Sequence, residues 1–226
     1  MISNAEHPFD DLAQSYDEDF SHTLIGELMR KRVWRWLDKS FLPGDRLLEL
    51  NCGTGEDALH LAKRGIEIEA TDASAGMIKV VRDKVEAGGL ERLIRTSQLS
   101  IENLDKLPSQ RVYDGIYSNF GGLNCVQDLS KTAKQLHLLC RPEGRVIVCV
   151  MGPVVPMEWF WYLSRGQFAK AFRRLNPAGI QWHELTIYYP SIGQLSRSFS
   201  PYFKLQRKAA LGALLPPPYI CLLYTS

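Results

Sequence analysis

A short acidic and glycine-containing segment, ELNCGTG at 49–55, carries the residue types that could hold a polar organic ligand. Glu49 offers a carboxylate, while Gly53 and Gly55 let the backbone approach a ligand closely because they lack a Cβ atom. Asp72 lies 17 residues after Gly55, at the end of the next apolar run, where a carboxylate can accept hydrogen bonds from a ribose diol. This combination predicts a site for a nucleotide-like ligand.

The hydrophobic pattern predicts the elements that position these residues. An apolar run precedes the glycine segment and a helical pattern follows it. This alternation continues to about residue 151 and predicts a Rossmann-like α/β fold: a doubly wound, mostly parallel seven-stranded sheet with helices on both faces and a C-terminal antiparallel strand pair. The expected strands are 46–50, 67–71, 93–99, 113–118, 145–151 (a buried strand after a turn at 142–144), 185–189 and 203–215. The expected helices are 9–38, 57–64, 75–87, 129–139 and 157–175, with a short one before 203.

The chain of 226 residues has the length of a single domain with a sizeable core. We expect five parts: an N-terminal helical entry segment at 1–40, a cofactor-binding core at 45–151, an aromatic helical lid insertion at 152–184, final strands at 185–220, and an artefact at 221–226. These last residues, CLLYTS, are the in-frame translation of TGT CTC TTA TAC ACA TCT, which resembles the mosaic-end adapter of transposase-made sequencing libraries. We therefore expect the natural chain to continue past Ile220.

Two classes of cofactor use a glycine loop of this kind. The run GTGEDA at 53–58 fits the G-x-G-x-x-A pattern of dinucleotide-binding proteins. Glu56 and Asp57, however, place two negative charges at a helix N-terminus, where they would repel a pyrophosphate. Glu49 adds a carboxylate that suits an amino group. The segment therefore favours a cationic ligand, and a nucleotide-dependent (NAD-type) oxidoreductase is the alternative.

Four segments, in order, resemble motifs of the class I S-adenosylmethionine-dependent methyltransferases: ELNCGTG at 49–55, TDAS at 71–74 with Met77, YDGIYSN at 113–119 and LLCRPEGRVIV at 138–148. The resemblance covers about residues 9–151 closely and the remainder by topology. It implies methyl transfer with S-adenosyl-L-methionine as cofactor. The cofactor-binding residues that it implies are Glu49 at the methionine amino end, Gly53 and Gly55 in the loop, Asp72 at the ribose hydroxyls with Ala73 beside it, and Met77 against the adenine.

Two positions depart from the family pattern. Asn51 stands in place of the first family glycine, and asparagine is among the non-glycine residues that best tolerate a left-handed backbone. We expect the loop to survive this change, and the Asn51 side chain is a candidate ligand contact. Ser100 lies where many relatives have an aspartate near the adenine and is the candidate for that place. The segment FDDLAQSYD resembles the family's entry segment, in which Tyr16 would close over the cofactor, with helix packing as the alternative role.

Methyl transfer aligns the acceptor, the methyl group and sulfur, so positioning and exclusion of water supply much of the catalysis and a base is optional. The sequence nominates no firm catalytic residue. Asn119, after the fourth strand, is a candidate for orienting the acceptor or contacting the cofactor, or it forms a turn. His183 is a candidate base, with a surface or core histidine as the default. Six aromatic residues could line a lid over an apolar acceptor or form core: Trp159, Phe160, Trp161, Tyr162, Phe168 and Phe172.

Composition limits the possible partners. A formal net charge of +2 gives no case for nucleic acid or an anionic membrane, and we expect the basic clusters at 30–32 and 170–174 to be solvated helix faces. The longest apolar run, from Val146 to just beyond Met151, is too short to span a bilayer. The five cysteines lack paired spacing and no group of residues has metal-ligand spacing, so we expect a reducing, cytoplasmic setting and no metal.

These observations together predict methyl transfer from S-adenosylmethionine to a small organic or lipid-like acceptor. We expect a monomer or homodimer with no nucleic-acid partner and no stable insertion into a membrane. Besides the NAD-type oxidoreductase, a non-catalytic S-adenosylmethionine-binding protein is an alternative, because the sequence offers no clear base.

Overall fold

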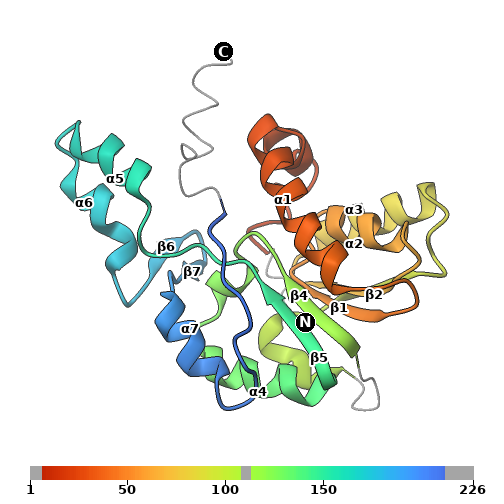
Figure 1. Ribbon diagram of the computed structural model, residues 1–226. Coiled ribbons are helices and arrows are strands. Elements are labelled where there is room, and N and C mark those ends of the chain that lie inside the picture. Colours follow the sequence, from red (N-terminus) through yellow and green to blue (C-terminus); the bar gives the residue numbers. More distant parts are fainter. Residues whose placement is uncertain (1–6, 108–112, 212–226) are drawn as a thin grey trace, which may run out of the picture.

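A five-stranded parallel sheet forms the centre of the computed structural model, which describes residues 7–107 and 113–211 (Figure 1). The strands lie in the order β3-β2-β1-β4-β5, because after β3 the chain crosses back and places β4 on the other side of β1. Ligands of doubly wound sheets bind outside the carboxyl ends of the strands at such a switch point. The strands span Arg46–Leu50 (β1), Glu67–Asp72 (β2), Ile94–Gln98 (β3), Tyr113–Ser118 (β4) and Cys140–Val148 (β5).

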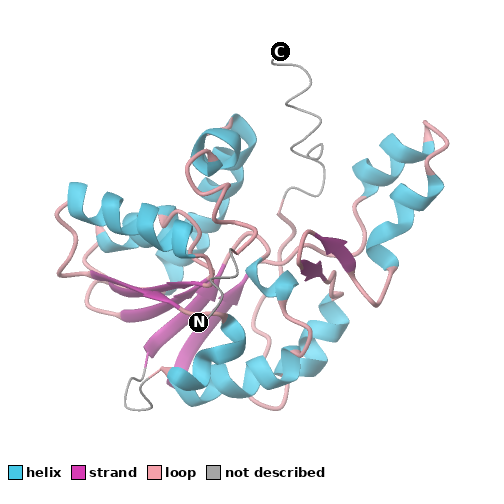
Figure 2. Cartoon of the chain, turned by 180° about the vertical axis from the view of Figure 1, so that it is seen from behind, coloured by secondary structure: helices cyan, strands magenta, loops and turns pink. Residues whose placement is uncertain are grey.

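Helices cover both faces of the sheet, as the sequence predicts (Figure 2). Successive side chains of a strand point to opposite faces, and Leu47 and Leu48 accordingly belong to two separate apolar cores. The first core includes residues of α1 (Leu24–Ser40), α2 (Glu56–Ala62) and α3 (Ala75–Ala87), and the second includes residues of η2 (Ile101–Lys106), α4 (Leu129–Leu139) and α7 (Ile192–Phe199). No helix in the described part of the chain has the length and apolar character needed to cross a bilayer.

The packing of α3 against the loop before α2 depends on a glycine. Gly55 has a φ of +80°, and a Cβ atom there would lie 2.8 Å from the Val81 side chain, so a larger residue would displace α3. The helix begins at Ser74, whose hydroxyl accepts a hydrogen bond from the Met77 amide at 3.0 Å. Met77, Ile78 and Val81 are buried at helical spacing. The apolar face of α3 therefore holds the glycine loop at the carboxyl end of β1.

The entry segment differs from the single helix expected at 9–38. Residues 8–15 form turns, a π-helix spans Asp17–Ser21 (η1), and α1 begins after Thr23, whose side chain accepts a hydrogen bond from the Gly26 amide. The chain folds back closely at this point, since a Cβ atom at Gly26 would lie 1.9 Å from the Phe20 carbonyl oxygen. The expected helix is thus broken by a tight reversal that brings the entry segment over the sheet.

The expected single sheet of seven strands is wrong for the described residues. The two further strands, β6 (Ile180–Trp182) and β7 (Leu185–Ile187), form a separate antiparallel pair around the turn at 183–184. The antiparallel pair therefore lies earlier in the sequence than expected. A strand was expected at 203–215, but its described part, 203–211, contains none. Pairing across a short turn is local, whereas pairing 185–189 with 203–215 would have closed a longer loop. The predictions for 1–6, 212–220 and 221–226 concern residues outside the described ranges.

The fifth strand differs from the prediction in both extent and burial. The sequence predicts a buried strand at 145–151, but β5 begins at Cys140, lies at the edge of the sheet, and is exposed at Arg145 and only half-buried over 146–148. The expected turn at 142–144 is instead an irregularity within the strand, because the pairing with β4 shifts register there. Glu143 has a φ of +63° at this shift. Extra residues in one strand are the mark of a β-bulge.

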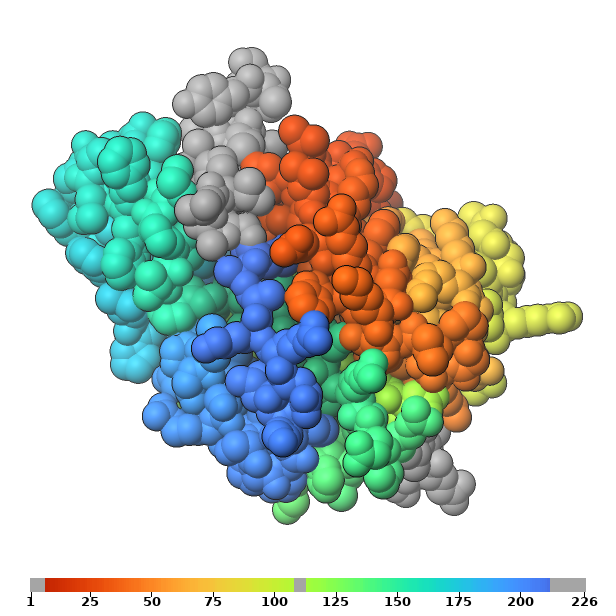
Figure 3. Space-filling model, in the orientation of Figure 1, coloured from red at the N-terminus to blue at the C-terminus, as the bar shows by residue number. Residues whose placement is uncertain are grey.

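The segment between β5 and β6 forms a helical lobe that projects from the sheet (Figures 1 and 3). The helix expected at 157–175 is divided into α5 (Pro156–Leu163), α6 (Phe168–Phe172) and the 3-10 helix η4 (Arg173–Leu175). Gly166, with a φ of +67°, turns the chain between α5 and α6. We call residues 151–175 the aromatic lobe. Whether it serves as the predicted lid stays a prediction.

One buried side chain holds both ends of the insertion 151–188. Asn124, in the 3-10 helix η3 (Gly122–Cys125), accepts a hydrogen bond from the Met151 amide at 2.9 Å and donates to the Met151 carbonyl at 2.8 Å. The side-chain Nδ2 of Asn124 also donates to the Tyr188 carbonyl at 2.5 Å. The backbone carbonyl of Asn124 accepts a hydrogen bond from the Tyr188 amide at 2.7 Å. The insertion therefore leaves and rejoins the domain near the carboxyl end of β4.

Candidate functional site

The loop after β1 turns through three left-handed residues. Asn51, Gly53 and Gly55 have φ angles of +53°, +54° and +80°. The backbone at Asn51 thus adopts the conformation that the sequence analysis expected of it. The side chain of Asn51 lies against Gly122, where a Cβ atom would be only 2.5 Å from Asn51 Oδ1. Gly122 therefore leaves room for an amide that points toward the end of β4.

Asp72 joins the end of β2 to the glycine loop. Its Oδ2 accepts a hydrogen bond from the Gly53 amide at 2.9 Å, and its Oδ1 accepts from the Ser74 amide at 2.9 Å. Burial raises the pKa of the Asp72 carboxyl, while these amides oppose the rise because they stabilise the carboxylate. Each oxygen keeps a second lone pair, so Asp72 can still accept hydrogen bonds from the hydroxyls of a ligand.

Glu49 is a buried carboxyl at the carboxyl end of β1. It is 3% exposed, and burial followed by the charge of Asp57 raises its pKa well above the usual range. The Tyr117 hydroxyl and the Arg30 cation oppose this rise. A nearby opposite charge favours the ionised form of a carboxyl. The position of Glu49 therefore suits a positively charged ligand group.

Several buried oxygen atoms beside Glu49 lack a hydrogen-bond partner. Within the ranges 7–107 and 113–211, these include Asn51 Oδ1, Ser118 Oγ and Asn119 Oδ1. They follow or end the adjacent strands β1 and β4, which pair in parallel up to Leu50 and Ser118. Buried polar atoms in native proteins are nearly always hydrogen-bonded, so such atoms indicate a place where a ligand or water binds. The edge between β1 and β4 therefore offers acceptors to a donor-rich ligand group.

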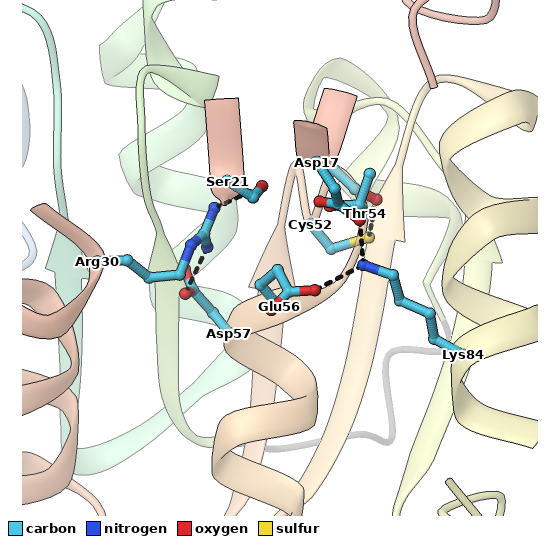
Figure 4. Close-up of polar contacts among 9 residues, drawn as sticks. Asp17, Ser21, Arg30, Cys52, Thr54, Glu56, Asp57 and Lys84 are labelled. Carbon is cyan, nitrogen blue, oxygen red and sulfur yellow. Dashed lines mark hydrogen bonds and ion pairs between the residues drawn. The ribbon is translucent and has the colours of Figure 1, made fainter. Parts of the chain in front are cut away.

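Asn119 is oriented by Asp57, the second residue of α2. Its Nδ2 donates a hydrogen bond to Asp57 Oδ2 at 2.8 Å. A carboxylate only accepts, so this contact turns the amide nitrogen of Asn119 toward Asp57 and leaves Oδ1 available. The other oxygen of Asp57 accepts a hydrogen bond from Arg30 Nη1 at 2.7 Å (Figure 4). It also accepts one from Trp34 Nε1 at 2.7 Å. Asp57 therefore ties α1 and α2 to a side chain of the site.

The two acids that argued against a pyrophosphate are both paired with cations. Asp57 pairs with Arg30 at 2.7 Å, and Glu56 pairs with Lys84 at 2.6 Å. Arg30 is only 8% exposed, so its expected place on a solvated helix face is wrong, because Asp57 draws the guanidinium into the protein. The preference for a cationic ligand therefore rests on Glu49 and on the unpartnered acceptors, rather than on Glu56 and Asp57.

The entry segment closes over the site through two aspartates. Asp10 Oδ1 accepts a hydrogen bond from the Ser74 hydroxyl at 2.5 Å, at the start of α3. Asp17 accepts from the Thr54 hydroxyl at 2.6 Å and pairs with Lys84 at 2.5 Å (Figure 4). Burial acts to raise the pKa of Asp17, but hydrogen bonds from Lys84 and Thr54 outweigh it, so the pKa is lowered. Asp17 is therefore held as a carboxylate over the glycine loop.

Tyr16 directly precedes Asp17, which binds the Thr54 hydroxyl of the glycine loop. Burial raises the pKa of the Tyr16 hydroxyl, the Arg30 cation opposes this rise, and the Asp72 carboxylate adds to it. Its ring lies 5.7 Å from that of Phe20, centroid to centroid. This position is compatible with closing over a ligand and with packing, so both roles stay predictions.

The remaining residues of the expected cofactor site follow β2 and β3. Met77 is buried in the first turn of α3. The Ala73 carbonyl accepts a hydrogen bond from Gln98 Nε2 at 3.2 Å. Ser100 Oγ accepts from the Glu102 amide at 3.3 Å and so caps η2. All three lie near the carboxyl edge of the sheet, and the Ser100 hydroxyl is engaged by its own helix.

His183 lies apart from these residues. It occupies the exposed turn between β6 and β7 with a φ of +50°, and its ring packs edge-on against Trp182 with centroids 4.7 Å apart. Trp182 in turn contacts Phe9 of the entry segment at 4.9 Å. No hydrogen bond within the described residues joins the His183 ring to Glu49, and its role as a base stays a prediction.

One group of possible metal ligands is brought together by the fold. Asp17, His22 and Glu56 each place a ligand atom within 4.8 Å of the others. The Lys84 ammonium pairs with both carboxylates, at 2.5 and 2.6 Å, so a cation already stands between them. Sequence spacing could not reveal this group because its members come from separate segments. We assign no metal to it.

The residues that support the site carry little signal in the sequence. Asp57 is predictable only as a charge at a helix N-terminus, because its partner Arg30 lies 27 residues away on the preceding helix. Lys84 and Asp17 are 67 residues apart, and no local pattern connects them. Asn124 lies in the segment SNFGGLNC, whose only signal was its place after a strand. Supporting residues of this kind become visible only once the strands are ordered.

Comparison with known proteins finds matches to the segment that contains the glycine loop. Residues 47–144 match the family described as "Methyltransferase domain". The chain is 33% identical over 145 residues to the demethylmenaquinone methyltransferase of Mycobacterium marinum, an alignment that covers 62% of this chain and 56% of that protein. The chain thus spans a little over half of the length of this relative. A demethylmenaquinone methyltransferase of Corynebacterium glutamicum is 27% identical over 206 residues, with 85% of this chain and 81% of that protein covered.

A solved structure shows the same fold. The phosphoethanolamine N-methyltransferase 2 of Haemonchus contortus, in complex with S-adenosyl-L-methionine, superposes with a TM-score of 0.61. The superposition covers 85% of this chain and 41% of that one, at 16% sequence identity. At this identity the likeness concerns the fold alone, which agrees with the α/β sheet and its switch point between β1 and β4.

Proposed function

We propose that this chain, which carries at residues 47–144 a class I S-adenosylmethionine-dependent methyltransferase domain, transfers a methyl group to a small, lipid-like organic acceptor. The family match confirms the resemblance seen in the sequence, and with it the enzyme class of the domain and S-adenosyl-L-methionine as its cofactor. The acceptor, the role of each site residue and the activity of the whole protein are the proposal.

The residues at the edge of β1 and β4 fit this cofactor. The carboxyl of Glu49 and the unpartnered amide oxygens of Asn51 and Asn119 are acceptors, as the ammonium group of a methionine moiety requires. Asp72 offers its remaining lone pairs to a ribose diol. This grouping of buried acceptors around the glycine loop is the observation that carries the proposal.

The chain's own residues act mainly by positioning. S-adenosylmethionine, when bound, supplies an electrophilic methyl group on a sulfonium. Glu49 and Asn119 would hold its amino end and Asp72 its ribose, which fixes the direction in which the methyl group faces an acceptor. The entry segment, fastened by Asp17 and Asp10, would exclude water from the site. His183 remains the candidate base for an acceptor that must lose a proton.

The relatives support an acceptor of lipid-like character. Both curated relatives above are named as demethylmenaquinone methyltransferases, although the first is matched over little more than half of its length. The aromatic residues of the lobe stand on the insertion that Asn124 holds beside β4. An apolar acceptor would enter between this insertion and the glycine loop.

Ligand binding gives the first test. We expect S-adenosylmethionine and S-adenosylhomocysteine to raise the melting temperature of the wild type, since a ligand at a hundred times its Kd adds about 2.7 kcal/mol to stability. Asp72→Ala should weaken both shifts. Asp83→Ala, which removes an exposed aspartate on α3, is the matched control and should leave them unchanged. A shift with NADH and none with the two methyl-cycle ligands would overturn the proposal.

Transfer of the methyl group is the second test. Radiolabelled S-adenosylmethionine would be incubated with a panel of demethylated quinols, which are lipid-like, and with water-soluble phenols and amines. We expect label in the organic phase with the quinols. Binding without transfer to any member of the panel would favour a non-catalytic S-adenosylmethionine-binding protein, and transfer to the water-soluble compounds alone would exclude the lipid-like acceptor.

A further inference from the structure

Exposed apolar side chains are concentrated on the aromatic lobe, residues 151–175. Figure 3 shows this segment in teal, at one side of the molecule. Within the described residues, eight of the fifteen large apolar side chains that are exposed belong to this short segment. Phe160 and Phe168 are the most exposed among them, at 71% and 63%. Proteins that remain free in water rarely gather apolar side chains in this way unless a partner covers them.

The exposed residues lie on one side of each helix of the lobe. On α5 they recur every three positions, and from α6 into η4 they recur at intervals of four and three, which is the spacing of a helix face. The buried residues of the two helices, Glu158, Tyr162 and Ala171, lie at other positions. The helices also meet where the ring of Trp159 lies 5.3 Å from that of Phe172, which is itself 41% exposed. The exposed set comprises Met157, Phe160, Leu163, Phe168, Phe172 and Leu175.

The lobe is also strongly basic. It contains four arginine and lysine residues and one acid, a formal charge of +3 on a chain whose total is +2. The acid, Glu158, is 1% exposed and pairs with Arg173 and Arg174, both at 2.6 Å. These ion pairs draw the two arginines inward, so the prediction that they lie on a solvated helix face is wrong. The remaining cations, Arg165 and Lys170, are exposed and form no ion pair with a carboxylate of the described residues.

We propose that the aromatic lobe docks on the surface of a bilayer that contains anionic lipids. Helices with apolar and aromatic residues on one side and lysine or arginine nearby lie in the membrane interface without crossing it. Arg165 illustrates the arrangement, because its guanidinium lies 3.3 Å from the centroid of the Trp161 ring and so keeps a cation beside an aromatic side chain. Anionic lipid headgroups complement the charge of the lobe.

The charge of the lobe distinguishes a bilayer from a second copy of the chain. If the lobes of two copies packed against each other, two surfaces of charge +3 would face each other and repel. The formal net charge, which gave no case for an anionic membrane, conceals this local excess because the rest of the chain is slightly acidic. Docking requires only the exposed apolar and basic residues of the lobe and does not depend on the acceptor proposed above. It would bring the edge of β4 near a lipid-like substrate.

Vesicle sedimentation with the full chain tests the proposal. We expect binding to vesicles of phosphatidylcholine with about a third phosphatidylglycerol, weaker binding as salt is raised, and little binding to phosphatidylcholine alone. Phe160→Ser with Phe168→Ser should abolish binding. Arg165→Gln with Lys170→Gln should weaken it about fivefold for each cation removed. Leu138→Ser, at a side chain 69% exposed on α4, and Lys131→Gln with Lys134→Gln are the matched controls and should bind as the wild type does.

The outcomes separate docking from misfolding and from the proposed enzyme activity. Every variant would first be required to show a wild-type melting-temperature shift with S-adenosylhomocysteine, which depends on the glycine loop and not on the lobe. Vesicle binding that the lobe variants retain, or that the wild type lacks, would overturn the proposal. A dimer that Phe160→Ser abolishes, seen by analytical ultracentrifugation without vesicle binding, would assign the surface to a second copy instead.

Discussion

Asn119 Nδ2 donates a hydrogen bond to Asp57 Oδ2 across 2.8 Å, and this contact determines which end of the amide faces the glycine loop. Asp57 is itself held by Arg30 and Trp34, so a chain of three elements, α1, α2 and the end of β4, converges on one carboxylate. The buried Arg30–Asp57 ion pair thus orients the Asn119 side chain. The effect of removing Asp57 on the stability of the protein can be measured.

Asp57→Ala should strongly destabilise the protein. Removing one member of a buried ion pair leaves the other charge uncompensated and costs about 3–5 kcal/mol, here at Arg30. Urea unfolding at neutral pH would measure the loss. Glu27→Ala is the control, because it breaks an exposed pair with Lys31 and should leave the unfolding midpoint nearly unchanged. Equal effects of the two substitutions would show that the Arg30–Asp57 pair does not stabilise the fold.

Glu49→Gln should separate stability from ligand binding. The pKa of Glu49 is raised in the folded protein, so its contribution to stability is full below the unfolded pKa and is lost as the pH rises through the folded pKa. Without ligand, Glu49→Gln should therefore raise the melting temperature relative to the wild type as the pH is increased toward neutrality. It should also weaken the binding of S-adenosylmethionine, because in the proposed role the ionised carboxylate of Glu49 holds the ammonium group of the ligand. Parallel melting curves from acid to neutral pH, with and without ligand, would check both, and a variant that binds as tightly as the wild type would contradict the role of Glu49.

Two substitutions at Asn51 should differ in their effect on stability and have the same effect on ligand binding. Asn51→Ala places a residue that disfavours the left-handed region at a φ of +53° and should destabilise by about 1 kcal/mol, whereas Asn51→Gly should be neutral or slightly stabilising. Both remove the unpartnered Oδ1 and should weaken S-adenosylmethionine several-fold by calorimetry. Full affinity in the glycine variant would show that this amide does not contact the ligand.

Asn124→Ala should loosen the insertion 151–188 while leaving the sheet intact. The substitution removes the hydrogen bonds of the side chain to Met151 and Tyr188 and should cost about 2 kcal/mol. Hydrogen exchange should accelerate in 151–188 and stay slow in β1 and β4. Asn176→Ala, which removes a bond to Gly179 within the insertion, is the control and should change exchange only near 176–179. Uniformly faster exchange would instead indicate a global loss of stability.

The parts of the fold that were predictable depend on local patterns. β1, β4, α3 and α4 have the predicted bounds. Apolar periodicity, the Ser74 cap and flanking glycines are signals that lie within a few residues of each element. The glycine loop and Asp72 were predictable for the same reason. In both cases the sequence signal lies inside the element itself.

The rest depended on contacts between distant segments. The strand expected at 185–189 is present as β7, but its partner was misplaced, because β7 pairs with the nearer β6 and not with 203–211. The turn at 142–144 is a bulge because β4 continues beside it. Arg30 was expected in solvent because its partner lies 27 residues away on another helix. Likewise, Arg173 and Arg174 of the lobe are drawn out of solvent by their ion pairs with Glu158, and no periodicity in the sequence connects Glu158 to them.

The attachment of both ends of the insertion to Asn124 has an evolutionary consequence. A segment that departs and returns at one side chain can be lengthened, shortened or replaced by recombination without altering the register of β1 to β5. Under the proposed function, residues 151–188 are therefore free to diverge under selection for new acceptors, while the glycine loop is constrained by the methyl donor. Sequence variation among descendants of this gene should accumulate in the insertion, which makes it the natural place to graft another enzyme's specificity.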